Sequence, residues 1–169
     1  MAESTKPTFL VDAYADPVVV RIEGRASFAN SGDLKHFLDV MLRQGRHRFI
    51  LDFDHCASMD STFLGVVAGL ALELRRQGPP ARLVLARVHD RNLDLIHNLG
   101  LHRLAIVDAG GPLPAAAAGS LPIEISARSE VENARLMLEA HEHLISADAA
   151  NATKFQDVLA FLRNRVEGK

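Results

Sequence analysis

Residues 46–77 read RHRFILDFDHCASMDSTFLGVVAGLALELRRQ and contain the pattern that decides the fold. In residues 46–54 the apolar run through Phe49 and Phe53 is too continuous for a half-exposed edge strand, so it predicts a central, buried strand. The loop HCASMDS follows. Residues 61–77 then predict a helix that is apolar on nearly every side in its first half and charged only near its end. This segment therefore joins a buried strand to a helix with a buried start.

Strands and helices alternate on both sides of this segment. The stretches rich in Val, Ile, Phe and Tyr predict strands, and apolar residues at helical spacing predict amphipathic helices. We expect strands at 8–14, 18–23, 81–88 and 104–107, a helix at 33–44 after the polar loop RASFANSG, and a short helix at 91–99. The alternation predicts an α/β fold with parallel strand pairs and right-handed crossovers.

After residue 108 the composition changes. Residues 109–122 are rich in Gly, Ala and Pro and predict a linker between a domain at 1–108 and a helical hairpin at 123–169. The hairpin helices are expected at 129–145, with Ser129 and Glu132 as a capping box, and at 151–166. Their apolar faces must dock on the first domain, on a second copy or on a partner, and we expect a homodimer. The residues expected at that contact are Leu138, Phe155, Leu159, Leu162 and Val166.

Composition excludes several classes of function. The 169 residues are 48% apolar and carry a net charge of -2, which is unfavourable for binding nucleic acid. The single cysteine, Cys56, cannot form an internal disulfide, and we expect a buried, unreactive thiol in a reducing compartment, the cytoplasm. We expect no secretion signal, and the longest apolar stretch, 63–72, is too short for a membrane span.

Ser61 stands where a helix begins, at the junction of the buried strand and the buried helix. Free N–H groups and the positive end of the helix dipole favour an anion there, so a phosphate on Ser61 would be stabilised by the helix but repelled by Asp60. Either Asp60 or Ser61 could instead serve only as the helix cap, because both residue types are preferred at that position.

The sequence DSTFLGV at 60–66 resembles the DSSGLGV/DSTGLGV signature of STAS domains, the family of bacterial anti-sigma factor antagonists. The strand FILDFDHCASM before it, IEGRASFANSGDLKHFL at 22–38 and ARLVLARVHDRNLDLIHNLGLHRLAIVD at 81–108 also resemble family elements, in the family's order. The resemblance covers residues 8–108. It implies a STAS-like mixed β-sheet flanked by helices.

The resemblance also implies a phosphorylation-controlled partner switch without a cofactor, a metal or an enzymatic activity. In such systems the unphosphorylated domain binds an anti-sigma factor that is a serine kinase of the histidine-kinase-like ATPase fold. These systems control transcription. Phosphorylation of the serine after the signature aspartate ends the binding, and a phosphatase restores it. By position the phosphoacceptor is Ser61, with Thr62 the weaker candidate.

Two departures from the family pattern affect the expected partner surface. Phe63 replaces a common glycine and is expected to place an apolar ring on that surface, and Ser27 stands where the family usually has an acidic residue. The expected partner-binding residues are Ser27, Phe28, Asn30, Asp60, Ser61, Thr62 and Phe63.

These departures favour an alternative, a constitutive scaffold: an accessory subunit, for example of a lipid-handling ABC transporter, or a self-assembly module. A serine enzyme is disfavoured because Ser61 lacks the flanking glycines of a nucleophile elbow. His141 and His143 at i and i+2 point apart on a helix, so we expect solvated surface histidines rather than a metal site.

Overall fold

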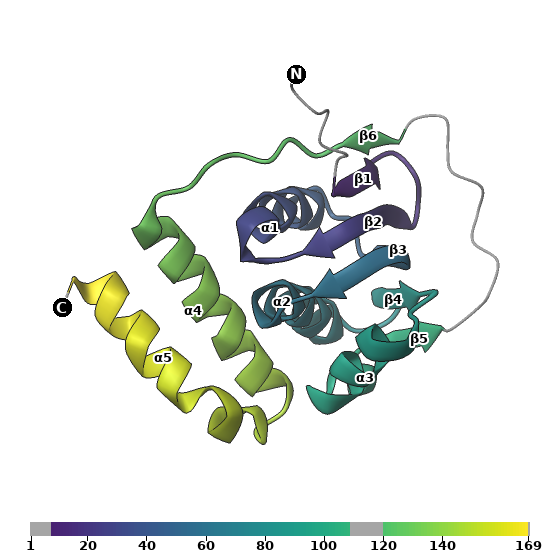
Figure 1. Cartoon of the computed structure of the whole chain (residues 1–169). Coiled ribbons are helices and arrows are strands. Elements are labelled where there is room, and N and C mark those ends of the chain that lie inside the picture. The colour runs from purple at the N-terminus through teal and green to yellow at the C-terminus, as the bar shows by residue number, and fades with distance from the viewer. Residues whose placement is uncertain (1–7, 109–119, 169) are drawn as a thin grey trace.

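The computed structural model describes residues 8–108 and 120–168 (Figure 1). Its strands form one six-stranded sheet in the order β5-β4-β3-β2-β1-β6. The strands are β1 Phe9–Asp12, β2 Val18–Ala26, β3 Arg48–Met59, β4 Arg82–Ala86, β5 Ile106–Asp108 and β6 Leu121–Pro122. The helices are α1 Phe28–Arg43, α2 Ser61–Gln77, α3 Asp90–Asn98, α4 Glu130–Ala147 and α5 Asn151–Glu167, with a short 3₁₀ helix at Leu101–Arg103.

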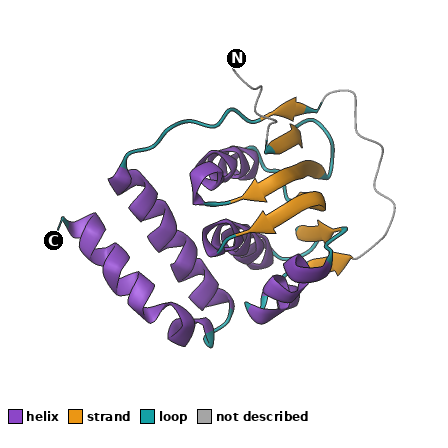
Figure 2. Cartoon of the chain, viewed as in Figure 1, coloured by secondary structure: helices purple, strands orange, loops and turns teal. Residues whose placement is uncertain are grey.

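The sheet is mixed, as expected. Strands β2, β3, β4 and β5 pair in parallel, whereas β1 is antiparallel to both β2 and β6. The predicted α/β class and the extra helical hairpin are both confirmed (Figure 2). Strand β3 lies inside the sheet with Phe49, Leu51 and Phe53 fully buried, as the continuous apolar run predicted.

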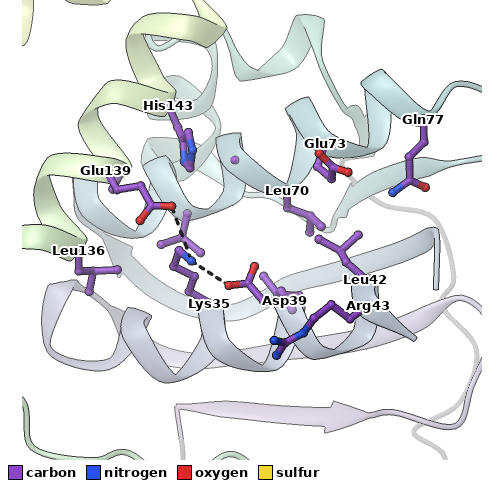
Figure 3. Close-up of a pocket in the computed structure, with 14 residues that line it drawn as sticks. Lys35, Asp39, Leu42, Arg43, Leu70, Glu73, Gln77, Leu136, Glu139 and His143 are labelled. Atoms are coloured by element: carbon purple, nitrogen blue, oxygen red, sulfur yellow. Dashed lines mark hydrogen bonds and ion pairs between the residues drawn. The ribbon is translucent and has the colours of Figure 1, made fainter. Parts of the chain in front are cut away.

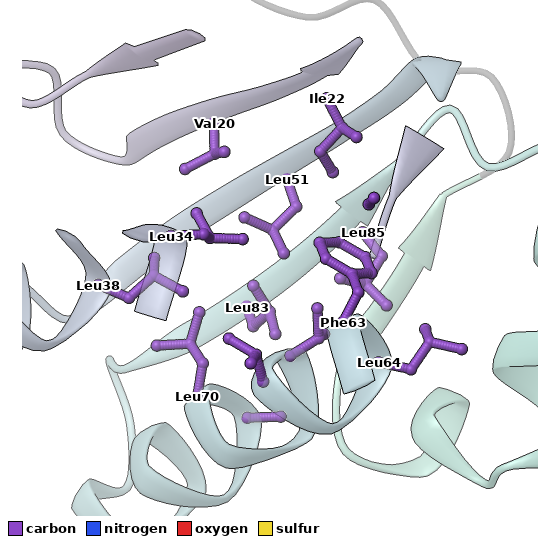
Figure 4. Packing of buried hydrophobic residues seen from close by; sticks show 14 of the residues in the cluster. Val20, Ile22, Leu34, Leu38, Leu51, Phe63, Leu64, Leu70, Leu83 and Leu85 are labelled. Carbon is purple, nitrogen blue, oxygen red and sulfur yellow. The ribbon is translucent and has the colours of Figure 1, made fainter. Parts of the chain in front are cut away.

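The core lies between the sheet and helices α1 and α2 (Figure 4). Val20, Leu51 and Leu85 from the strands meet Leu34 of α1 and Leu64 of α2. Outside these helices, α4 packs against α2, and α5 lies against α4 (Figure 1). The start of α2 is therefore enclosed by the sheet on one side and by the C-terminal hairpin on the other.

Among the helix and strand boundaries, those of α1 and β3 differ most from the sequence prediction. Helix α1 begins at Phe28 rather than at residue 33, because Ser27 caps it and Asn30 completes a capping box. Strand β3 continues to Met59 through residues predicted as a loop, because it remains paired with β2 as far as the Ala26–Met59 partners. Strand β2 therefore leads almost directly into α1, and strand β3 leads almost directly into α2.

The C-terminal end of the predicted linker is also corrected. Residues 121–122 form β6 and pair with Leu10 and Val11 of β1, whereas residues 109–119 lie outside the described residues. The last strand of the parallel set, β5, begins at Ile106 rather than at 104. The chain beyond residue 108 therefore returns to the far edge of the sheet before α4 starts.

The C-terminal hairpin folds back on its own domain. The capping box of Ser129 and Glu132 is present at the start of α4. Leu159 and Leu162 of the predicted dimer stripe are buried within the chain, while Leu138, Phe155 and Val166 are half-buried. Much of this stripe therefore packs within the chain, while Val158 and Phe161 of α5 stay exposed. The homodimer stays a prediction.

Candidate functional site

The start of α2 is fixed by Asp60, which is its cap. One carboxylate oxygen, Oδ1, accepts a hydrogen bond from the backbone N–H of Phe63 at 2.9 Å, and the other, Oδ2, accepts from Phe28 at 2.8 Å. The backbone N–H of Asp60 also donates to the carbonyl of Ala26 at 3.1 Å. One carboxylate thus joins the first turns of α1 and α2, and the two segments expected to contact a partner lie side by side.

In the first of these segments, Ser27 and Asn30 have structural roles. Ser27 is buried, and its hydroxyl accepts from the N–H of Ala29 at 3.2 Å. The Asn30 side chain accepts from the N–H of Ser27 at 2.9 Å and donates to the carbonyl of Arg25 at 2.9 Å. Phe28, by contrast, is 42% exposed. Of the three, Phe28 is the one that presents a large side chain at the surface.

The second segment contains a correction to the sequence analysis. Phe63 is fully buried, with its ring stacked on Phe9 at a centroid distance of 6.3 Å and edge-on to Phe53 at 6.1 Å. The expectation that Phe63 places an apolar ring on a docking surface is therefore wrong. Phe63 lies in the first turn of α2 with its side chain directed toward the sheet, where it contacts Phe9 and Phe53. Thr62 is buried as well, at 2% exposure, whereas Ser61 is half-buried.

Ser61 contacts a residue that the sequence analysis did not connect with it. Its hydroxyl oxygen lies 2.8 Å from Nε2 of His141 on α4, and Nδ1 of His141 lies 2.6 Å from the carbonyl oxygen of Met137. A carbonyl only accepts, so Nδ1 is protonated. In the neutral ring Nε2 then accepts the hydrogen bond that the Ser61 hydroxyl donates.

His141 itself is 2% exposed and lies edge-on to Phe155, at a ring-centroid distance of 4.9 Å. The prediction of a solvated surface histidine is wrong for this residue, because α4 turns this side toward α2. No short sequence pattern could have shown this contact, since 80 positions separate the two side chains.

A cavity of about 470 Å³ opens beside Ser61. Its wall contains Leu64, Leu95 and Phe155 as well as Asn98 and Lys154. The Lys154 ammonium group donates to the carbonyl of Asn98 at 2.6 Å. The Lys154 ammonium group and the N-terminus of α2 therefore lie at the same cavity as the Ser61 hydroxyl. The Asp60 carboxylate adds a negative charge to the wall of this cavity.

A second cavity of about 480 Å³ lies among α1, α2 and α4 (Figure 3). Lys35 of α1 bridges its rim, with its ammonium group 2.8 Å from Asp39 and 3.6 Å from Glu139 of α4. Leu70 and Leu136 line it with apolar surface. The contact between the hairpin and the rest of the chain is therefore only partly filled on this side.

Other ionisable residues in and near β3 form hydrogen bonds with one another. Arg87 donates two hydrogen bonds to Asp52, and a hydrogen bond with His89 lowers the pKa of Asp54. Burial raises the pKa of the Cys56 thiol to about 11, as expected of an unreactive cysteine. Within residues 8–108 and 120–168, three or more potential metal ligands do not gather at any point.

The fold and the site define an α/β domain with a half-buried serine hydroxyl at the start of a largely buried helix, extended by a helical hairpin. The family model described as "Mlab, STAS domain" matches residues 9–108, and the chain belongs to this STAS family. The resemblance expected from DSTFLGV is thereby confirmed.

Two solved structures show the same fold. A candidate anti-sigma factor antagonist from Thermotoga maritima is 18% identical, with a TM-score of 0.52 over 59% of this chain and 85% of that one. The Bacillus cell fate determinant SpoIIAA in its phosphorylated form is 21% identical, with a TM-score of 0.50 over 59% of this chain and 89% of that one. No protein of curated function matches the chain. Among the described helices, none is both long and apolar enough to cross a membrane.

Proposed function

We propose that this protein is a non-enzymatic, protein-binding regulator, an anti-sigma factor antagonist whose binding is controlled by phosphorylation of Ser61. The unphosphorylated form would bind an anti-sigma factor that is a serine kinase of the histidine-kinase-like ATPase fold. Phosphorylation would end the complex, and a phosphatase would restore it. Membership of the STAS family and the position of Ser61 support this proposal.

The observation that carries the proposal is the hydroxyl of Ser61 at the first position of α2. Asp60 caps the helix through its carboxylate, so the Ser61 side chain is not needed as the cap. Thr62 is buried, which leaves Ser61 as the better phosphoacceptor of the two. The backbone N–H of Phe28 donates to the same Asp60 carboxylate, and the exposed Phe28 side chain offers an apolar contact at the start of α1.

Phosphorylation here would change the charge of the surface. A phosphoserine adds about -1.5 to -2 charges at neutral pH. The N-terminus of α2 stabilises that charge, whereas the neighbouring Asp60 carboxylate repels it. An apolar partner surface docked on Phe28 would lose binding energy, because a new charge must then be desolvated. Binding and phosphorylation would therefore exclude each other.

A pair of bait proteins tests the proposal. Full-length Ser61→Ala and Ser61→Asp proteins are used to capture partners from native lysate, and Ser146→Ala and Ser146→Asp, at an exposed serine on α4, serve as matched controls. We expect an ATPase-fold serine kinase with Ser61→Ala and not with Ser61→Asp. Equal capture by both Ser61 baits would contradict the proposal.

A specific observation favours a second candidate, a constitutive scaffold. The Ser61 hydroxyl is already hydrogen-bonded to His141, and Ser27 stands where the family usually has an acidic residue. In this case Ser61 would have a structural role, and both baits would retain the same partner, such as a subunit of a lipid-handling ABC transporter. That complex would also be insensitive to ATP.

A further inference from the structure

The face of α2 that carries Ser61 is covered by α4 of the same chain. Leu136, Ala140 and Leu144 recur at every fourth position of α4, and all three are buried. This spacing is that of an amphipathic helix whose apolar side lies in a groove. The helix α4 thus binds α2 in the way that a partner helix would.

Two glycines shape α2 for a helix at close range. A methyl group added at Gly65 would overlap the carbonyl oxygen of Ala140, and one at Gly69 would overlap the ring of His143. Gly65 and Gly69 are one helical turn apart and so lie on the same face. The surface therefore fits a helix that presents a small residue, as α4 does with Ala140.

The hairpin is fastened at both ends of this contact. Asn151, at the start of α5, is fully buried and donates from its side chain to the carbonyls of Leu99 at 3.0 Å and Leu144 at 2.7 Å. At the other end Arg128 lies 3.2 Å from the carboxylate of Asp33 on α1. Between them the His141 side chain binds the Ser61 hydroxyl.

The contact is nevertheless imperfectly packed. A cavity remains among α1, α2 and α4, and Leu70 and Leu136 are part of its lining (Figure 3). Nδ1 of His143 is buried and, within the described part of the chain, lacks a hydrogen-bond partner. An unfilled cavity and an unsatisfied polar atom both weaken the docked state relative to a fully packed one.

We infer that the Gly65–Gly69 face of α2 is a helix-receiving binding surface, that α4 is its occupant within the chain, and that an external partner must displace α4 to reach it. The partner would present an amphipathic helix with Ala or another small residue facing the two glycines. Displacement of α4 would also release the Ser61 hydroxyl from His141. The statement that this partner is the target of an anti-sigma factor antagonist rests on the proposed function. The statement that α4 covers this face of α2 does not.

Thiol labelling tests whether α4 covers position 61. In a Cys56→Ala background, Ser61→Cys is labelled with Ellman's reagent, and Gln77→Cys at the exposed end of α2 gives the rate of an open position. We expect Ser61→Cys to react at least tenfold more slowly than Gln77→Cys. Equal rates would overturn the inference without any bearing on phosphorylation.

Two substitutions on opposite sides of the contact test whether α4 can be displaced. Ala140→Gln and Gly65→Ala each introduce atoms into the space between the two backbones, and each should raise the labelling rate of Ser61→Cys at least fivefold. Glu142→Gln, on the exposed side of α4, should leave the rate unchanged. Circular dichroism verifies that the variants keep their helices. Unchanged rates in both contact variants would overturn the inference.

A peptide supplied from outside tests the surface itself. A fluorescent peptide of residues 123–169 is added to the full chain, and its binding is followed by anisotropy. We expect no binding to the unaltered protein and saturable binding to Ala140→Gln. Absence of binding to a variant in which position 61 has become reactive would show that the face does not receive a helix, and would overturn the inference.

Discussion

Replacing Phe63 by alanine should destabilise the protein strongly, although the family signature commonly has glycine at this position. The Phe63 side chain is fully buried, and burial of such a side chain contributes about 1.5–3 kcal/mol. Its contacts with Phe9 and Phe53 contribute about 0.5–1.5 kcal/mol each. With the cavity that remains, we expect the free energy of unfolding to fall by about 3–5 kcal/mol.

Urea denaturation followed by circular dichroism measures this change. With a slope of about 1–3 kcal/mol per molar urea, the midpoint should fall by at least about 1 M. Phe161→Ala removes the same atoms from a ring that is 64% exposed, and should cost less than about 1 kcal/mol. If Phe63→Ala destabilises the protein no more than Phe161→Ala does, the assignment of Phe63 to the core is refuted.

Further predictions concern the cap, the hairpin, the acid range and the thiol. Asp60→Ala removes the acceptor for two helix-start N–H groups and should lower the free energy of unfolding by about 1–3 kcal/mol, measured in urea. Asn151→Ala should raise amide hydrogen exchange in α5 by at least tenfold, since two buried carbonyls lose their donor; unchanged exchange would contradict this. The lowered pKa values of Asp54 and Glu132 mean that their stabilising effect is present above the unfolded-state pKa, near about 4, and is lost as the pH falls through the folded values. The urea midpoint should therefore decrease below about pH 4, and an increase there would be inconsistent with these pairs. With its pKa raised to about 11, Cys56 should react slowly with Ellman's reagent at pH 8 and rapidly only in urea.

Much of the fold could be predicted from local patterns. The continuous apolar run around Phe49 predicted a buried strand, the long apolar segment that becomes charged near its end predicted α2, and helical spacing predicted the hairpin. The start of α1 was missed because its capping box uses Asn30 rather than Glu at the third position. The end of β3 was missed because polar residues there remain paired with β2, and alternation of hydrophobicity does not reveal pairing.

The candidate site was only partly predictable. The signature DSTFLGV located Ser61 and Asp60 correctly at the start of α2. The side on which Phe63 lies depends on the rotation of the first turn against the sheet, and this follows from packing with Phe9 and Phe53. The contact with His141 depends on how the hairpin returns to α2, which no spacing within either segment encodes.

The most direct test of the central claim is to add ATP to the complex captured with the unaltered protein. The bound protein is then analysed for release from its partner and for the modified residue by mass spectrometry. The account predicts that the complex dissociates and that a single phosphate is found on Ser61, not on Thr62. A complex that stays intact with ATP, with Ser61 unmodified, would contradict the switch and identify the protein as a constitutive scaffold.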